Sequence, residues 1–203
     1  MASMLPPAPE FGAPCPVEVS PATLDLLARR RSSSAQTLVG PGPDADQLAD
    51  LLRIAARAPD HGKLTPWRFV VLQGEAKARY VEALRALAPR QPNPEKAATV
   101  LAKIANPPVT VAVVSSPKPG AKPIWEQELS AGAVCTLMLV AAEAMGFGAN
   151  WITDWYAYDA EALKVLGAQE GEKVAGFVQL GTCGEVPLER IRPELADVVS
   201  TWG

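Results

Sequence analysis

The chain has 203 residues, 48% of them apolar and 20% charged, and its net charge is -3. That length fits one domain, or at most two small ones, and the near-balanced charge argues against a protein that coats nucleic acid. The single histidine excludes a histidine-rich zinc site, so we expect no metal, and three widely spaced cysteines suit a reducing cytosol rather than a disulfide framework. We expect a cytoplasmic protein in which a cofactor supplies the chemistry of any reaction.

The first part of the chain begins with a proline-rich segment. Residues 5–21 contain six prolines and no apolar periodicity, and the N-terminus lacks the basic-then-apolar order of a secretory signal. We therefore expect an arm over residues 1–20, disordered or draped on the surface, and a single domain over residues 21–203. The elements expected up to residue 87 are a helix from Ser20-Pro21 into 29–32, a loop over 33–43, a helix capped by Asp44 and Gln47 that ends before 59, a strand over 67–72 and a helix over 76–87.

The remaining chain predicts three more strands. The expected elements are a break at 89–94, a helix over 95–105, a strand over 109–114, a helix over 125–145, a strand over 149–153, a helix over 161–166, a strand over 174–180 and a tail over 185–203. The helix over 125–145 is mostly apolar, but its three glutamates make a membrane span costly, so we expect a buried central helix or a dimer-interface helix. Four short strands among six helices indicate an α+β fold or a mixed three-layer sheet.

Two basic clusters are the candidate sites. The RRS triplet at residues 30–32 lies at a predicted helix C-terminus, where cations pair with the negative end of the helix dipole. Its alternative role is a phosphate clamp of two guanidiniums and a hydroxyl, which local physics places second. Arg57, His61 and Lys63 precede a buried strand and form either a turn in which the histidine caps a neighbouring element, or a site for an anion and the edge of an electron-rich ring. For a lone histidine the turn is favoured.

Five motifs occur in order between residues 22 and 184. They are RRS, RAPDHGKLTPWRF, WEQELSAGA at the start of the long helix, GFGANW and FVQLGT. Together they resemble the nitroreductase superfamily, and within it a subgroup of small NAD(P)H nitroreductases. One such motif is weak evidence, whereas five in register carry a specific resemblance.

The resemblance implies a nitroreductase-like three-layer α+β fold. A central, mainly antiparallel sheet would be flanked by helices, and an intertwined homodimer would hold two FMN groups at its interface. The implied activity passes a hydride from NAD(P)H through flavin N5 to an electron-poor nitroaromatic or quinone in a ping-pong cycle. No side chain would be catalytic, and neither nucleic acid nor membrane would be a partner. The alternatives are a non-enzymatic flavin-binding or regulatory protein, and a specialised enzyme of the same fold such as a dehalogenase.

The resemblance also implies the flavin contacts. Arg30, Arg31 and Ser32 would hold the phosphate and ribityl chain, and Arg57 and His61 would contact FMN, one of them across the dimer interface. Lys63 falls where many members carry an asparagine. Further contacts are implied for Ala141, Ala142, Glu143, Ala144, Met145, Gly146, Trp151, Ile152 and Thr153. The basic C-terminal motif of many members is represented loosely by Arg190 and Arg192, which leaves their contact with the phosphate open.

Overall fold

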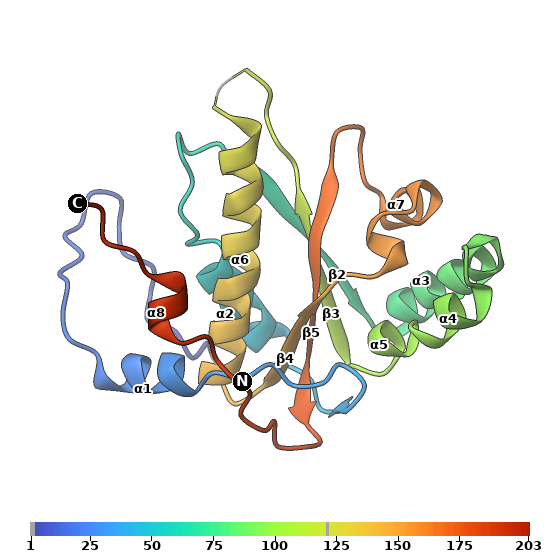
Figure 1. The fold of residues 1–203 in the computed structure, drawn as a ribbon, viewed down its shortest axis with the longest axis horizontal. Coiled ribbons are helices and arrows are strands. Elements are labelled where there is room, and N and C mark those ends of the chain that lie inside the picture. Colours follow the sequence, from blue (N-terminus) through green and yellow to red (C-terminus); the bar gives the residue numbers. More distant parts are fainter. Residues whose placement is uncertain (1–2, 121) are drawn as a thin grey trace.

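A five-stranded antiparallel sheet organises the molecule, which we describe from a computed structural model over residues 3–120 and 122–203. The longest strand, β5 (Lys173–Cys183), pairs with β3 (Val109–Ser115) along one edge and with β4 (Gly148–Ile152) and β1 (Leu38–Val39) along the other. The outer strand β2 (Trp67–Gln73) pairs with β3. Figure 1 shows the sheet at the centre of the molecule, with helices on both faces.

The two faces of the sheet carry separate apolar cores. Every residue of β3 is buried, and neighbouring side chains alternate between the faces. Val111 and Val113 pack with α2 (Ala45–Ala55) and α6 (Ile124–Ala144), whereas Ala112 and Val114 pack with the helices of the opposite layer. These are α3 (Gly74–Leu87), η1 (Ala88–Arg90), α4 (Pro94–Thr99), α5 (Ala102–Ala105), η2 (Trp155–Ala157) and α7 (Ala160–Leu166). The expected three-layer α+β fold with an antiparallel sheet is confirmed.

Local capping explains where several helices begin and end. The Asp44 carboxylate accepts a hydrogen bond from the Gln47 amide at 2.9 Å, and the Gln47 side chain accepts one from the Asp44 amide at 3.0 Å, so the expected capping box starts α2. The Asp159 side chain caps α7 by accepting hydrogen bonds from the Glu161 and Ala162 amides. Gly146 has a φ of 81°, which lets the chain leave α6 in the left-handed region that glycine tolerates.

Four expectations need correction. The expected helix over 95–105 is divided into α4 and α5, and the break places the consecutive side chains of Val100 and Leu101 in the core shared with α3. The expected loop over 33–43 contains β1, which forms only because its two residues pair with the end of β5. β5 is itself longer than expected, and the tail contains the short helix α8 (Leu195–Val198).

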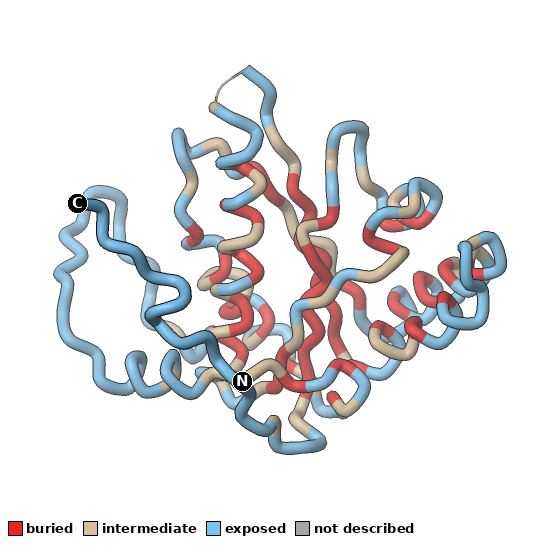
Figure 2. Tube along the Cα trace, in the orientation of Figure 1, coloured by how far each residue is buried: buried red, intermediate tan, exposed pale blue. Residues whose placement is uncertain are grey.

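Apolar side chains are exposed on one side of the molecule. The helix α1 (Pro21–Arg29) buries no residue, and Figure 2 shows that the arm, α1 and the tail are almost entirely exposed beside α6. Trp125 and Leu129 of α6 are 67% and 53% exposed. Within residues 3–120 and 122–203, no helix combines the length and apolar composition that crossing a membrane requires. This side of a single chain therefore has the character of an interface.

Candidate functional site

The segment after α1 forms a short strap, residues 30–33, across the C-terminal end of α6. The Ser33 amide donates to the Ala149 carbonyl at 2.9 Å, which fixes the strap to β4. The Arg30 side chain donates through Nη1 to Ser32 Oγ at 3.3 Å, so these two predicted contacts lie together. Both residues are half-buried. The pair presents a guanidinium and a hydroxyl as neighbouring hydrogen-bond donors.

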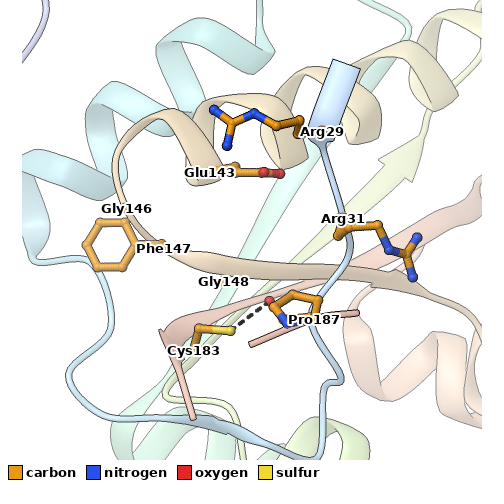
Figure 3. Close-up of a pocket in the computed structure, with 9 residues that line it drawn as sticks. Arg29, Arg31, Glu143, Gly146, Phe147, Gly148, Cys183 and Pro187 are labelled. Carbon is orange, nitrogen blue, oxygen red and sulfur yellow. Dashed lines mark hydrogen bonds between the residues drawn. The ribbon is translucent and has the colours of Figure 1, made fainter. Parts of the chain in front are cut away.

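Arg31 lines a pocket of about 290 Å³ beside the strap, shown in Figure 3. Its Nε donates to the Leu188 carbonyl at 2.9 Å, and the Glu189 carboxylate lies 4.0 Å away. The Arg31 side chain is thereby engaged with the tail of the same chain, whereas the side chains of Arg30 and Ser32 bond to each other. The pocket is lined by Arg29, Arg31, Ser33, Glu143, Gly146, Phe147, Gly148, Cys183 and Pro187.

Sequence reasoning missed several residues of this pocket. Ser33 is 3% exposed, and its hydroxyl lies 3.3 Å from the thiol of Cys183. The two residues are far apart in the sequence, and no local pattern links them. Phe147 and Gly148 belong to the GFGANW motif, so that motif was the available indication of their position. Arg192 reaches the strap through its Nη2, which donates to the Arg30 carbonyl at 3.2 Å.

The loop between α2 and β2 carries the second basic cluster. Arg57, His61 and Lys63 are all exposed. His61 Nδ1 lies 2.6 Å from Glu126 Oε2 in the first turn of α6, so the imidazole pairs with a side chain of the neighbouring helix rather than with its backbone amides. Lys63 has a φ of 56°, a strained value for a residue with a side chain.

The Asp60 carboxylate holds this loop in shape. It accepts hydrogen bonds from the Leu64 amide at 3.1 Å and the Thr65 amide at 2.7 Å. Ser130 of α6 adds a bond from its hydroxyl to the Pro59 carbonyl at 2.7 Å. Because these bonds fix both ends of the turn, the strained Lys63 is kept in a defined position rather than sampling many conformations.

The two basic clusters lie at opposite ends of α6. The His61 partner Glu126 is in the first turn of α6, and Glu143, which lines the pocket beside the strap, is in its last. At 1.5 Å per residue these glutamates are roughly 26 Å apart along the helix axis. One chain therefore does not bring the strap and the loop cluster to the same place.

Trp151 of β4 packs closely against β5 and lies beside the middle of α6. Its indole N–H donates to the Ala175 carbonyl at 3.1 Å, where β5 departs from regular pairing with β3. The indole also covers Gly176, where a Cβ would overlap the ring, and its edge lies 3.7 Å from the Cβ position of Gly132. Trp151 as a whole is 37% exposed, so part of the residue remains open to solvent.

The other predicted contacts differ in accessibility. Ala141 and Ala142 are 2% and 0% exposed, so their side chains pack in the core. Glu143, Met145 and Ile152 are half-buried, whereas Ala144, Gly146 and Thr153 are exposed. The accessible groups thus lie at the end of α6 and at the end of β4.

Comparisons with known proteins agree with this fold. A relative from Escherichia coli (strain K12), described as "Putative NAD(P)H nitroreductase YdjA", is 37% identical over 164 residues, covering 78% of this chain and 87% of the relative. A Haemophilus influenzae relative of similar description is 33% identical over 162 residues, with the same coverages.

Solved structures and a family model extend the comparison. A nitroreductase-like family protein from Bacillus cereus has a TM-score of 0.80 at 19% identity, covering 92% of this chain and 99% of that one. A Desulfovibrio desulfuricans structure in complex with FMN has a TM-score of 0.73 at 18% identity, covering 91% and 99%. The sequence model of the Nitroreductase family matches residues 27–182, more than half of the chain. From its matched sequence and its fold, the chain belongs to the nitroreductase family.

Proposed function

We propose that this protein is an FMN-dependent oxidoreductase that takes electrons from NAD(P)H and gives them to an electron-poor acceptor, a nitroaromatic or a quinone. The division of the basic residues between the two ends of α6 carries this proposal, together with the family. Structures of relatives from Desulfovibrio desulfuricans and Bacteroides fragilis contain FMN, and the sequence relatives are described as NAD(P)H nitroreductases. When bound, FMN accepts a hydride from NAD(P)H and passes two electrons to the acceptor, which uses the same site in turn.

The Arg30–Ser32 pair fits the phosphate end of FMN. Within the described residues Arg30 pairs with no carboxylate, so its remaining N–H groups are available to an anion. A guanidinium beside a hydroxyl suits the oxygens of a phosphate. Arg192 lies against the Arg30 carbonyl and brings a further cation to the strap. Arg31, whose Nε donates to the Leu188 carbonyl, contributes to this end through its positive charge and its hold on the tail.

The loop cluster fits the ring end of FMN. Arg57 and Lys63 are exposed cations on a loop whose turn is fixed by Asp60, so they require little reorganisation to stabilise negative charge that develops on a bound ring. His61 is tied to Glu126, which orients its imidazole. Trp151, partly exposed beside the middle of α6, offers an apolar surface between the two ends of the helix.

A second copy of the chain is required to complete the site. If two copies pack with their α6 helices antiparallel, the strap of one protomer meets the loop cluster of its partner, and two-fold symmetry produces two equal sites. The exposed apolar residues of α6 and α1, among them Trp125, Leu129, Leu24 and Leu27, supply the surface that such packing buries. We therefore propose a homodimer with one flavin at each end of the shared interface.

The direct test is the flavin content of variants. Arg30→Ala combined with Ser32→Ala should leave the purified protein without FMN, read as the ratio of flavin absorbance to protein absorbance. Arg29→Ala is the matched control, because Arg29 is an exposed arginine of α1 paired with Asp25. A double variant that kept its full flavin content would contradict the phosphate assignment.

Mixing two inactive variants tests whether the site is shared. One chain carries Arg30→Ala and Ser32→Ala, and the other carries Arg57→Ala and His61→Ala. In a mixed dimer one of the two sites is intact and the other is doubly impaired. Random exchange of equal amounts makes about half of the dimers mixed, so the mixture should recover about a quarter of the wild-type flavin content. A mixture that stays empty would show that strap and loop of the same chain act together.

Reduction by the nicotinamide distinguishes an enzyme from a flavin-binding protein. Without oxygen, the yellow protein should bleach on addition of NADPH or NADH and recover its colour when a quinone is added. A yellow protein that neither nicotinamide bleaches would favour the non-enzymatic alternative. A colourless protein that FMN does not reconstitute would overturn both.

A further inference from the structure

The proline-rich arm is anchored to the domain by a buried carboxylate. Asp50 of α2 is 3% exposed, and it accepts hydrogen bonds from the Ser3 hydroxyl at 2.8 and 3.1 Å and from the Met4 amide at 2.7 Å. Burial by itself would raise the pKa of Asp50, but the bonds from the arm and the charge of Arg53 outweigh it and leave the pKa below its ordinary value. The main hydrogen-bond partners of this carboxylate are therefore residues of the arm, which precedes the region matched by the family model.

From this anchor the arm runs along the exposed side of α2. Arg53 donates through Nη2 to the Pro6 carbonyl at 2.9 Å. A pocket of about 290 Å³ lies between residues 5–9 of the arm and the side chains of Arg53, Ile54 and Arg57. The arm thus borders Arg57, one of the proposed flavin contacts.

The arm also reaches the second proposed contact of the loop. The ring centroid of Phe11 lies 5.9 Å from Lys63 Nζ, within range of a cation–π interaction. The side chain of Phe11 is otherwise fully exposed, so the rest of the ring is open for stacking. Residues 3–11 therefore pass from a buried anchor at Asp50, beside Arg57, to Lys63.

Apart from Ser3 and Glu10, the chemistry of this segment is apolar and stiff. Pro6, Pro7 and Pro9 have restricted backbones and no amide donors, so they offer surface rather than hydrogen bonds. With Leu5 and Phe11 they form an apolar strip next to two cations. Such a strip contacts flat, apolar molecules by dispersion and aromatic stacking, and offers little to a small hydrated ion.

On the basis of the proposed function, we propose that residues 3–11 form a wall of the acceptor site and that Phe11 selects planar aromatic acceptors over small inorganic oxidants. The Lys63 ammonium beside Phe11 orients the aromatic ring, and Asp50 keeps the apolar strip in place. In this arrangement Asp50 is a positioning residue, because it acts only through the arm. Phe11 stacks on the acceptor.

The first experiment uses the full-length holoprotein with Phe11→Ala, and Val17→Ala as the control, because Val17 is an equally exposed arm residue beyond the contacts with α2 and Lys63. Naphthalene-2-carboxylate, which is planar and is not reduced by flavin, is titrated while the fluorescence of the bound flavin is followed. Phe11→Ala should weaken its binding roughly 2- to 5-fold, the size of one exposed aromatic contact. Phe11→Trp should retain wild-type binding.

The second experiment compares two acceptors. For a naphthoquinone, Phe11→Ala should raise KM by a similar factor with little change in kcat, because the lost contact is made before and during the reaction alike. Ferricyanide should be reduced by both proteins at the same rate. Phe11→Ala and wild type could instead have the same quinone KM and bind naphthalene-2-carboxylate equally well, both with full flavin content. That result would refute the role of residues 3–11 in the acceptor site and leave the proposed function standing. A wild-type protein without flavin would refute the proposed function instead.

The anchoring of the arm by Asp50 is tested by hydrogen exchange, which does not depend on turnover. Asp50→Ala should abolish the slow hydrogen exchange of the Met4 amide and raise the quinone KM in the same way as Phe11→Ala, with unchanged flavin content. Unchanged Met4 exchange in a folded Asp50→Ala protein would overturn the anchoring role. If this variant does not fold, Phe11→Ala alone decides the proposal.

Discussion

Replacing Glu172 should remove an ion pair that joins the outer strand β2 to the turn before β5. Arg68 of β2 donates to the Glu172 carboxylate through Nε at 2.8 Å and Nη2 at 2.6 Å, and the Gln169 amide donates at 2.8 Å. The Glu172 side chain is 6% exposed. The hydrogen bonds from Arg68 lower the pKa of Glu172 from 4.5 to about 2, against the opposing effect of burial.

The pKa difference sets the size of the effect. A shift of one pKa unit corresponds to about 1.4 kcal/mol of folding free energy. The lowered pKa of Glu172 therefore corresponds to a stabilisation of ~3 kcal/mol. Because Arg68 is 36% exposed and water screens it, we expect Glu172→Gln to lower the free energy of unfolding by about 2 kcal/mol at neutral pH. The folded-state pKa is the lower one, so this stabilisation is complete above pH 4.5 and is lost as the pH falls towards about 2.

Urea unfolding at several pH values provides the assay. The stability difference between wild type and Glu172→Gln should be constant above pH 4.5 and close progressively below it. Glu161→Gln is the control, because Glu161 forms an exposed pair with Lys164 at 2.7 Å and should change stability little at any pH. A difference that stays constant down to about pH 2 would refute the assignment of the stabilisation to the charged pair.

Three further changes follow from packing. Gly176→Ala puts a methyl group into the Trp151 indole, so the melting temperature should fall and the tryptophan emission should shift; an unchanged spectrum would contradict this packing. Gly148→Ala places a Cβ 2.6 Å from Leu38 Cδ2 and 2.8 Å from Ser33 Oγ, and overpacking of this kind should cost about 1–3 kcal/mol in urea unfolding. Leu129→Glu adds a charge to the exposed face of α6 and should yield a monomer without flavin by light scattering and absorbance, whereas a flavin-loaded dimer would oppose the shared site.

The course of the main elements could be predicted from local sequence. The Asp44 capping box and the glycine at 146 mark helix ends through contacts within a few residues, and the apolar run of β3 is typical of a buried strand. These features depend on neighbours in the sequence. β1 was missed because its two residues form a strand only by pairing with the distant end of β5.

The candidate site was only partly predictable. The motifs indicated Arg30, Arg31, Ser32 and the loop cluster as candidate contacts, and only the fold shows that Arg30 bonds to Ser32 while Arg31 bonds to the tail. The pairing of Ser33 with Cys183 and the anchoring of the arm on Asp50 join residues far apart in the sequence. No local pattern encodes such contacts.

The sequence by itself determined the residue types of the site, the absence of a second histidine and the family resemblance. The tertiary structure decided that the strap and the loop cluster stand at opposite ends of α6, beside glutamates that are roughly 26 Å apart along the helix axis. The reason is physical: short-range hydrogen bonds and apolar periodicity define a helix, but its length and the elements packed at its two ends set the distance between the groups beside them. That distance is what makes a second copy of the chain necessary for the proposed site.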